Sequence, residues 1–325
     1  MDKIIRKKDS CIKVETRELG VKSARGQDLE YYSSQNFTVA INPRGLLRYH
    51  SIILPHRSIN SITELNNSER MELSELYGLV TPLLVKFADG AKENESRSYI
   101  TALQTGYYEG RPSERFHIHL IPRSYADAYS GDHDRIYVDL YENGHVERSL
   151  EDAESMANAL RSSLEVYLRV RRNSGEINNT PRIRGTDNFC VGYMNDMILL
   201  DTGAFYLAYN HKPIVNGHSL IISRDHVRGL LDLRPEEVKE LYYMIDKAVT
   251  TLLDAYDTDA YDLKIRSGNK SGRTQDHFHI HIIPRPRTRD GTYEKYYVDQ
   301  EIRREARSKD EIVGEYNRLR ELFRR

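Results

Sequence analysis

The stretch His277-Phe278-His279-Ile280-His281-Ile282-Ile283 alternates strictly between histidines and apolar residues. Successive side chains of a β-strand face opposite sides of the sheet, so the three histidines are expected on one face, roughly 6.7 Å apart. Phe278, Ile280 and Ile282 are expected on the other face, packed into a core beneath a helix. Pro284 has no N–H to donate and is predicted to end the ladder. The row of imidazoles gathers groups that exchange protons, bind metals or act as nucleophiles.

The same pattern occurs twice in the chain. FHIHLIPR at residues 116–123 and FHIHIIPR at residues 278–285 lie 162 residues apart. Upstream of each, Asn and His stand eight residues apart, in NPRGLLRYH (42–50) and NHKPIVNGH (210–218). An apolar stretch and a long helical segment follow in both halves. Each half is therefore predicted to contain two strands, a long helix, two strands and a C-terminal helix.

The long helix expected in the second half, at 235–256, begins with Pro235 in its first turn. The polar stretch 171–185 is rich in Asn, Gly and Pro and is predicted to be the boundary between domains 1–175 and 176–325. The fold class is therefore α+β. One helical face repeats apolar residues at three- and four-residue spacing, which predicts burial of Val238, Leu241, Ile245, Ala248 and Leu252.

Composition excludes several classes of protein. The 325 residues contain 48 Lys and Arg against 49 Asp and Glu, a formal net charge of −1, which argues against a nucleic-acid-coating protein. No apolar run approaches the roughly 20 residues that span a bilayer, and the N-terminus lacks the apolar core of a secretory signal. Two cysteines, Cys11 and Cys190, cannot form a disulfide framework or a cysteine-rich zinc site. We expect a cytoplasmic protein with neither a membrane nor a nucleic-acid partner.

The residues alone leave two interpretations of the histidine row open. One is nucleophilic or acid–base chemistry, and the other is a metal site, because adjacent histidines on one strand can reach a single ion. No carboxylate or cysteine partner is identifiable from spacing, so no metal ligand is assigned.

The motif at 277–283 resembles the signature of the histidine triad (HIT) superfamily of nucleotide hydrolases and transferases. Residues 210–238 and Gly272-Arg273-Thr274 resemble its fragile-histidine-triad branch. The resemblance covers about residues 190–300 and, more weakly, 30–140. It implies two HIT-like domains, each a mostly antiparallel sheet with a long helix and a C-terminal helix. Simple members are homodimers with joined sheets, so we expect an intramolecular pseudo-dimer with up to about ten strands, as a monomer or a homodimer.

The resemblance also implies a mechanism. His279 would attack the α-phosphorus of a dinucleoside polyphosphate or related nucleotide, and water would cleave the resulting nucleotidyl-histidine. His281 would hold phosphate oxygens and help protonate the leaving oxygen, His277 would polarise the phosphate, and His218 would lie behind the triad. No cofactor is required for this chemistry, although Mg²⁺ could accompany a polyphosphate.

Substrate-binding residues are also implied by the resemblance. Asn210 falls where the family binds ribose. Without the resemblance, this asparagine is equally well explained as a turn residue. The branch has glutamine where this chain has Arg266. Without the resemblance, this arginine is equally well explained as an exposed strand residue. An arginine at this position could still hold phosphate. The segment that would wrap the phosphates contains Arg266, Gly268, Gly272 and Thr274, and its glycines let the backbone approach.

The first half carries Arg115-Phe116-His117-Ile118-His119, in which arginine replaces the first histidine. Arg115 can add positive charge but cannot accept a proton. Asn42 and His50 are kept, and Gln104 occupies the position of the family's glutamine. This half is either a second working site or a decayed site that serves as a structural partner, and the complete triad of the other half favours the decayed site.

Hydrolase and transferase must also be separated. The uridylyltransferases and phosphorylases of the superfamily end the motif in glutamine, whereas both halves here end in histidine, His119 and His281, which favours hydrolysis. The tandem layout resembles those transferases, so a nucleotidyltransferase or phosphorylase stays an alternative, as does a nucleotide-binding sensor without turnover. The DNA-repair deadenylase branch adds a zinc finger, which two cysteines do not easily supply.

Overall fold

The chain was analysed as a computed structural model. It describes residues 29–89, 98–104, 116–124, 127–130, 135–141, 148–174, 185–268, 271, 275–285 and 307–324. Arg115, Gly272 and Thr274, named above as site residues, lie outside this set. The predicted division between residues 175 and 176 also falls outside it and stays a prediction.

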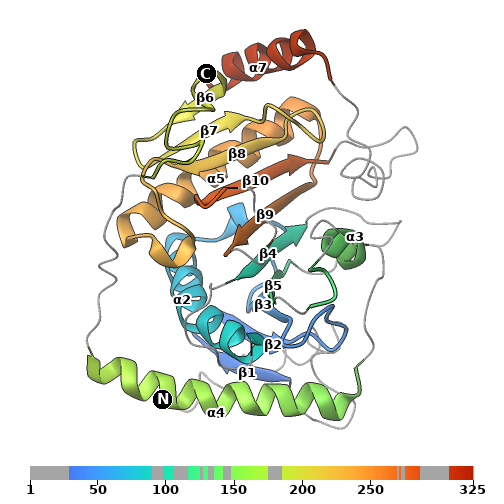
Figure 1. The fold of residues 1–325 in the computed structure, drawn as a ribbon, viewed down its shortest axis with the longest axis vertical. Helices are drawn as coiled ribbons and strands as arrows, with labels where there is room; N and C mark the ends of the chain where they lie inside the picture. Colours follow the sequence, from blue (N-terminus) through green and yellow to red (C-terminus); the bar gives the residue numbers. More distant parts are fainter. Residues whose placement is uncertain are drawn as a thin grey trace.

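One ten-stranded sheet runs through the described chain in the order β1-β2-β3-β5-β4-β9-β10-β8-β7-β6 (Figure 1). All neighbouring strands pair antiparallel. The strands are β1 (Glu30–Ser33), β2 (Phe37–Ile41), β3 (Ser51–Pro55), β4 (Tyr99–Gln104), β5 (Ile118–Pro122), β6 (Ile198–Asp201), β7 (Phe205–Tyr209), β8 (Ser219–Ser223), β9 (Tyr261–Ser267) and β10 (His279–Pro284). The order reads the same from both ends, because each half contributes five strands in the same arrangement.

The two halves are joined by β4 and β9, which pair from Tyr99↔Ser267 to Gln104↔Asp262. This pairing satisfies the backbone groups of both strands, which would otherwise be open sheet edges. Leu103 lies opposite Leu263, and Ala102 lies opposite Lys264. The expected α+β pseudo-dimer with one continuous sheet is therefore confirmed.

Four helices cover one face of the sheet: α2 (Asn67–Asp89), α4 (Leu150–Ser174), α5 (Pro235–Tyr256) and α7 (Lys309–Phe323). The long helix of the second half begins at Pro235 as predicted, and its five predicted core residues are buried. At the two ends of the sheet, α4 lies beside β1 and α7 beside β6 (Figure 1). No described helix combines the length and apolar character needed to cross a bilayer.

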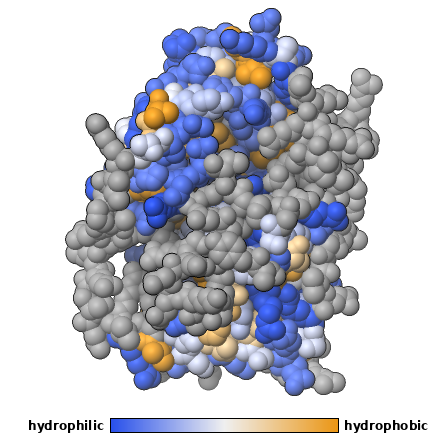
Figure 2. Space-filling model, viewed as in Figure 1, coloured by the Kyte–Doolittle hydropathy of each residue, from blue (hydrophilic) through white to orange (hydrophobic). Residues whose placement is uncertain are grey.

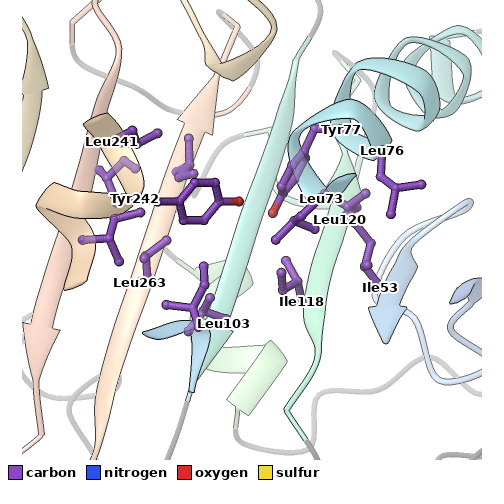
Figure 3. Close-up of a cluster of buried hydrophobic side chains, with 14 of the residues drawn as sticks. Ile53, Leu73, Leu76, Tyr77, Leu103, Ile118, Leu120, Leu241, Tyr242 and Leu263 are labelled. Carbon is purple, nitrogen blue, oxygen red and sulfur yellow. The ribbon is translucent and has the colours of Figure 1, made fainter. Parts of the chain in front are cut away.

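The main core lies between these helices and the sheet. Around the join between the halves, Tyr77 of α2 and Tyr242 of α5 approach Leu103 and Leu263 of the two central strands (Figure 3). On the outside, Figure 2 shows a face on which small separate groups of apolar residues lie among hydrophilic ones.

Two features differ from the expected element order. Each half has a third strand before its long helix, β1 or β6, and both are four residues long with a register shift against their neighbour. Such short, irregular segments carry too little period-two signal to be recognised. A short helix, α3 (Arg135–Tyr141), packs on the opposite face of the sheet, where Ile136 and Tyr137 are buried against Ile100.

The join predicts a large stability effect at one residue. Leu103 is 1% exposed, so Leu103→Ala should leave a cavity and lower the free energy of unfolding by about 2–5 kcal/mol. Val166→Ala, at a side chain that is 61% exposed on α4, is the matched control and should change it by about 0.5 kcal/mol or less. Urea titration measures both, and equal effects of the two substitutions would contradict this account of the core.

Candidate functional site

Two of the three predicted triad histidines lie on β10, between β8 and β9. His279 pairs with Ile222 of β8, and His281 lies opposite Leu220 on one side and Lys264 on the other. The alternate residues of this segment, Phe278, Ile280 and Ile282, are buried in the main core, as predicted. The alternating sequence therefore does separate a histidine face from a core face.

His281 is held by a chain of hydrogen bonds that fixes its proton. The backbone N–H of Ile214 donates to His218 Nδ1 at 3.1 Å, and His218 Nε2 lies 2.9 Å from His281 Nδ1. Because His218 Nδ1 accepts, its proton is on Nε2 and is donated to His281 Nδ1. The neutral His281 ring therefore carries its own proton on Nε2.

The charge state of His281 agrees with this assignment. Burial, followed by electrostatic interactions with His279, His218, Arg266 and Lys264, lowers the pKa of His281 well below its usual range. A neutral imidazole with a defined proton can donate a hydrogen bond without adding a charge to the buried site.

His279 has the opposite tautomer. Its Nδ1 lies 2.8 Å from the carbonyl oxygen of His277 and must donate to it, which leaves the lone pair of the neutral ring on Nε2. The side chain is only 5% exposed. The ring of Phe189 stands edge-on to it, with centroids 5.2 Å apart. His279 is thus a well-oriented imidazole with a nucleophilic nitrogen.

His277 is the exception to the prediction that all three histidines belong to one strand. It lies two residues before the first residue of β10 and is buried. Its Nε2 donates to the carbonyl oxygen of Ser223 at 2.7 Å, and its Nδ1 faces Asp187 at 3.2 Å and Cys190 at 3.3 Å. Both ring nitrogens therefore contact protein atoms.

Around His277, the structure reveals a cluster that sequence reasoning missed. The carboxylate of Asp187 lies 3.0 Å from Cys190 Sγ and 2.8 Å from His226 Nδ1. One ligand atom from each of Asp187, Cys190, His226 and His277 lies within 4.8 Å of the others, so these four side chains could hold a metal ion. The carboxylate and cysteine that could not be identified from spacing are therefore both present. The sequence does show Asp187 three residues before Cys190. The two histidines of the cluster, however, lie far from this pair in the sequence.

The cluster strongly perturbs its acidic members. Burial and the neighbouring Asp187 carboxylate raise the pKa of Cys190 to about 11. Burial alone would raise the pKa of Asp187, but hydrogen bonds from Cys190 and the charge of His277 outweigh it and hold that pKa well below its usual range.

Asn210, Arg266 and Gly268 are the other predicted residues of this half that the structure describes. Asn210 Oδ1 accepts from the backbone N–H of Lys212 at 2.9 Å, which confirms a turn role, and its Nδ2 is 3.3 Å from His218 Nε2. Arg266 is half-buried rather than exposed, and its Nε donates to the hydroxyl of Tyr137 from α3 at 3.3 Å. Gly268 adopts a φ of 77°, which glycine tolerates.

The first half repeats the hydrogen-bonded chain. The backbone N–H of Leu46 donates to His50 Nδ1 at 3.1 Å, and His50 Nε2 lies 2.9 Å from His119 Nδ1. The His119 proton is then on Nε2, which lies 3.0 Å from His117 Nε2. His117 Nε2 therefore accepts a hydrogen bond from His119 through its lone pair.

Two further first-half residues bear on this comparison. Asn42 Oδ1 accepts from the backbone N–H of Arg44 at 3.0 Å, the same turn as at Asn210. Gln104 lies in β4 opposite Asp262. The two sites thus share the turn at the asparagine and the hydrogen-bonded chain to the last histidine.

The lowered pKa of His281 predicts an acid-sensitive fold. An unfolded histidine titrates near 6.5, so below that pH the unfolded chain binds a proton that the native protein does not. The free energy of unfolding should therefore fall as the pH drops from about 7 to about 5. His281→Gln has no titrating group at this position and should lose less stability over that range in urea titrations. An identical pH dependence in both proteins would contradict the assignment.

Comparisons of the sequence with known proteins identify the family of this chain. The HIT domain model matches residues 192–288. A bis(5'-adenosyl)-triphosphatase of Dictyostelium discoideum is 31% identical over 126 residues, 39% of this chain and 85% of that protein. An asymmetrical bis(5'-nucleosyl)-tetraphosphatase of Schizosaccharomyces pombe is 37% identical over 76 residues, 23% of this chain and 42% of that protein.

Among solved structures, a uridylyltransferase superimposes over 91% of this chain and 87% of its own, with a TM-score of 0.55 and 10% identity. At this low identity, the structural likeness shows a shared fold, which extends over both halves. The sequence identity to the triphosphatase, over 85% of that protein, shows the family. The chain belongs to the HIT family.

Proposed function

We propose that the protein is a nucleotide hydrolase that cleaves at the α-phosphate of a dinucleoside polyphosphate or a related nucleotide. The observation that carries the proposal is the pair of hydrogen bonds at Nδ1 of His279 and Nδ1 of His281. They assign a lone pair to His279 Nε2 and a proton to His281 Nε2. The rings are neighbours, with centroids 5.2 Å apart. Relatives named as dinucleoside triphosphatase and tetraphosphatase support this substrate class.

In the proposed first step, His279 Nε2 attacks the α-phosphorus and the bond to the leaving oxygen breaks. His281 Nε2–H donates to a phosphate oxygen and helps the leaving group depart. The ring of the covalent nucleotidyl-histidine gains positive charge, which strengthens the Nδ1–H bond to the carbonyl of His277. Water then attacks phosphorus, the P–N bond breaks, a proton passes to solvent and the neutral imidazole is restored.

The nucleotide would lie along the turn and strand that flank the two histidines. We assign the ribose to Asn210 and the phosphate chain to Arg266 and the backbone at Gly268, and we extend that assignment to Gly272 and Thr274. Lys264 lies opposite His281 in the register and adds a second cation beside the phosphates. No cofactor is needed for the nucleophilic step, although Mg²⁺ can accompany a polyphosphate. A cytoplasmic location and a monomeric or homodimeric state stay predictions.

Transfer to an acceptor other than water is the second candidate function. The same nucleotidyl-histidine would be cleaved by phosphate or a sugar phosphate, as the tandem arrangement of the two halves would permit. A nucleotide sensor without turnover is the third. For the first half we propose a structural role, because arginine replaces the first histidine of its triad at residue 115.

The proposed nucleophile predicts a severe loss of turnover in one variant. His279→Ala should lose several orders of magnitude in rate, roughly 5 kcal/mol or more, with diadenosine triphosphate as substrate. His117→Ala, the matched change in the other half, should keep most activity. Product analysis with and without added phosphate separates hydrolysis from phosphorolysis. Normal activity in His279→Ala together with loss of activity in His117→Ala would show that the second half was wrongly assigned as the active one.

Covalent trapping provides a separate prediction. Rapid quenching with substrate should label one histidine per chain, His279, because only its half of the chain carries all three histidines of the triad. Intact-mass measurement and peptide mapping locate the label. A second label on His117 would show that the first half is also a working site.

A further inference from the structure

The short helix α3 of the first half is fixed in place by polar contacts. Arg123, directly after β5, donates from Nε to Asp127 at 2.7 Å and from Nη2 to the carbonyl oxygen of Tyr129 at 3.2 Å. The Tyr129 hydroxyl donates to Asp139 of α3 at 2.9 Å, and Arg135 Nε donates to the same carboxylate at 2.8 Å. The position of α3 is therefore set by a chain of hydrogen bonds that begins at the end of the histidine strand β5.

Apolar contacts hold the same helix against both halves at once. Ile136 of α3 belongs to a buried cluster that includes Ile121 of β5 and Ile283 of β10. Ile121 and Ile283 each lie two residues after the last histidine of their half, so the cluster lies on the histidine face of the sheet. The helix therefore packs on that face where the two halves meet.

From this position, Tyr137 of α3 contacts two basic residues of the second half. Arg266 Nε donates to the Tyr137 hydroxyl at 3.3 Å, and the guanidinium carbon lies 5.0 Å from the centre of the ring. Lys264 Nζ lies 4.1 Å from the same centre. An aromatic face attracts cations, and the attraction is stronger away from water. Tyr137 is fully buried, so these contacts fix both basic side chains.

The two basic residues lie beside the proposed reaction centre. Lys264 is directly opposite His281, and Arg266 follows it by two residues on β9. All three therefore lie on one face of the sheet. Two cations at successive positions of that face suit a leaving group with more than one phosphate, because each phosphate adds negative charge along the chain.

We propose that Tyr137 is a positioning residue that holds Lys264 and Arg266 so that the second half selects leaving groups with several phosphates. This inference rests on the proposed function and narrows its substrate class to dinucleoside polyphosphates, as opposed to nucleotides whose leaving group has no phosphate. A hydrogen bond at Nε fixes the plane of the Arg266 guanidinium, and a fixed plane favours the two-bond geometry in which arginine binds phosphate. The first half thereby contributes a residue to the site of the second.

The choice of leaving group tests this role. Tyr137→Phe keeps the ring and removes only the hydroxyl, and circular dichroism verifies its fold. We expect the ratio of kcat/KM for diadenosine triphosphate to kcat/KM for the para-nitrophenyl ester of AMP to fall about tenfold, the effect of one lost hydrogen bond to a charged group. The ester has no phosphate in its leaving group. An unchanged ratio in the active, folded variant would overturn the proposal.

Arg266 and a second tyrosine provide the matched variants. Arg266→Gln, which introduces the residue found at Gln104 in the first half, should also lower the ratio. Tyr137→Phe should lower it no further in the Arg266→Gln background, because the hydroxyl acts through this arginine. Tyr31→Phe, at a buried tyrosine whose hydroxyl donates to Ser51, is the control and should leave the ratio unchanged. Additive losses in the double variant would contradict the assigned role.

Binding of inorganic tripolyphosphate tests the two cations without turnover. In isothermal titration calorimetry at constant ionic strength, Tyr137→Phe, Lys264→Gln and Arg266→Gln should each bind it about tenfold more weakly than the wild type. These differences in a wild type that cleaves neither nucleotide would refute the hydrolase and support the role of Tyr137. Equal affinities in an active protein would overturn that role and leave the hydrolase in place.

Discussion

The antiparallel pairing of β4 with β9 is the contact on which the rest of the structure depends. Each half is an incomplete sheet whose inner edge strand has backbone groups to satisfy, and each edge is completed by the other half. Because β5 and β10 lie next to these two strands, the pairing also places both histidine strands one position from the join. The core beneath the sheet continues across the same line, from α2 to α5.

Much of this arrangement follows from short-range sequence patterns. The alternation around His279 predicts a strand with two different faces, and the spacing within 235–256 predicts the buried face of α5; both are confirmed. The repeat predicts the pseudo-dimer, because two copies of one half supply matching edges. These features depend on periodicity, which a single sequence displays directly.

Features that depend on distant residues were harder to predict. His277 fits the alternation, yet its side chain is determined by Asp187, which lies 90 positions earlier. No periodic signal connects Asp187 and Cys190 to His226. In the same way, Tyr137 of the first half reaches Arg266 of the second only because the join brings α3 over β9. Tertiary contacts assemble these groups, and local propensity does not reveal them.

The pairing of Ala102 with Lys264 has a consequence for how the two halves can diverge. These residues occupy equivalent places, since Ala102 lies opposite His119 and Lys264 lies opposite His281. In a symmetric dimer of identical subunits, a residue at this position would face its own copy across the twofold axis. A lysine would then meet a lysine, and directly opposed like charges destabilise a sheet. Joining both subunits in one chain removes that symmetry requirement, so one histidine site can acquire a cation while its counterpart remains uncharged at the same position.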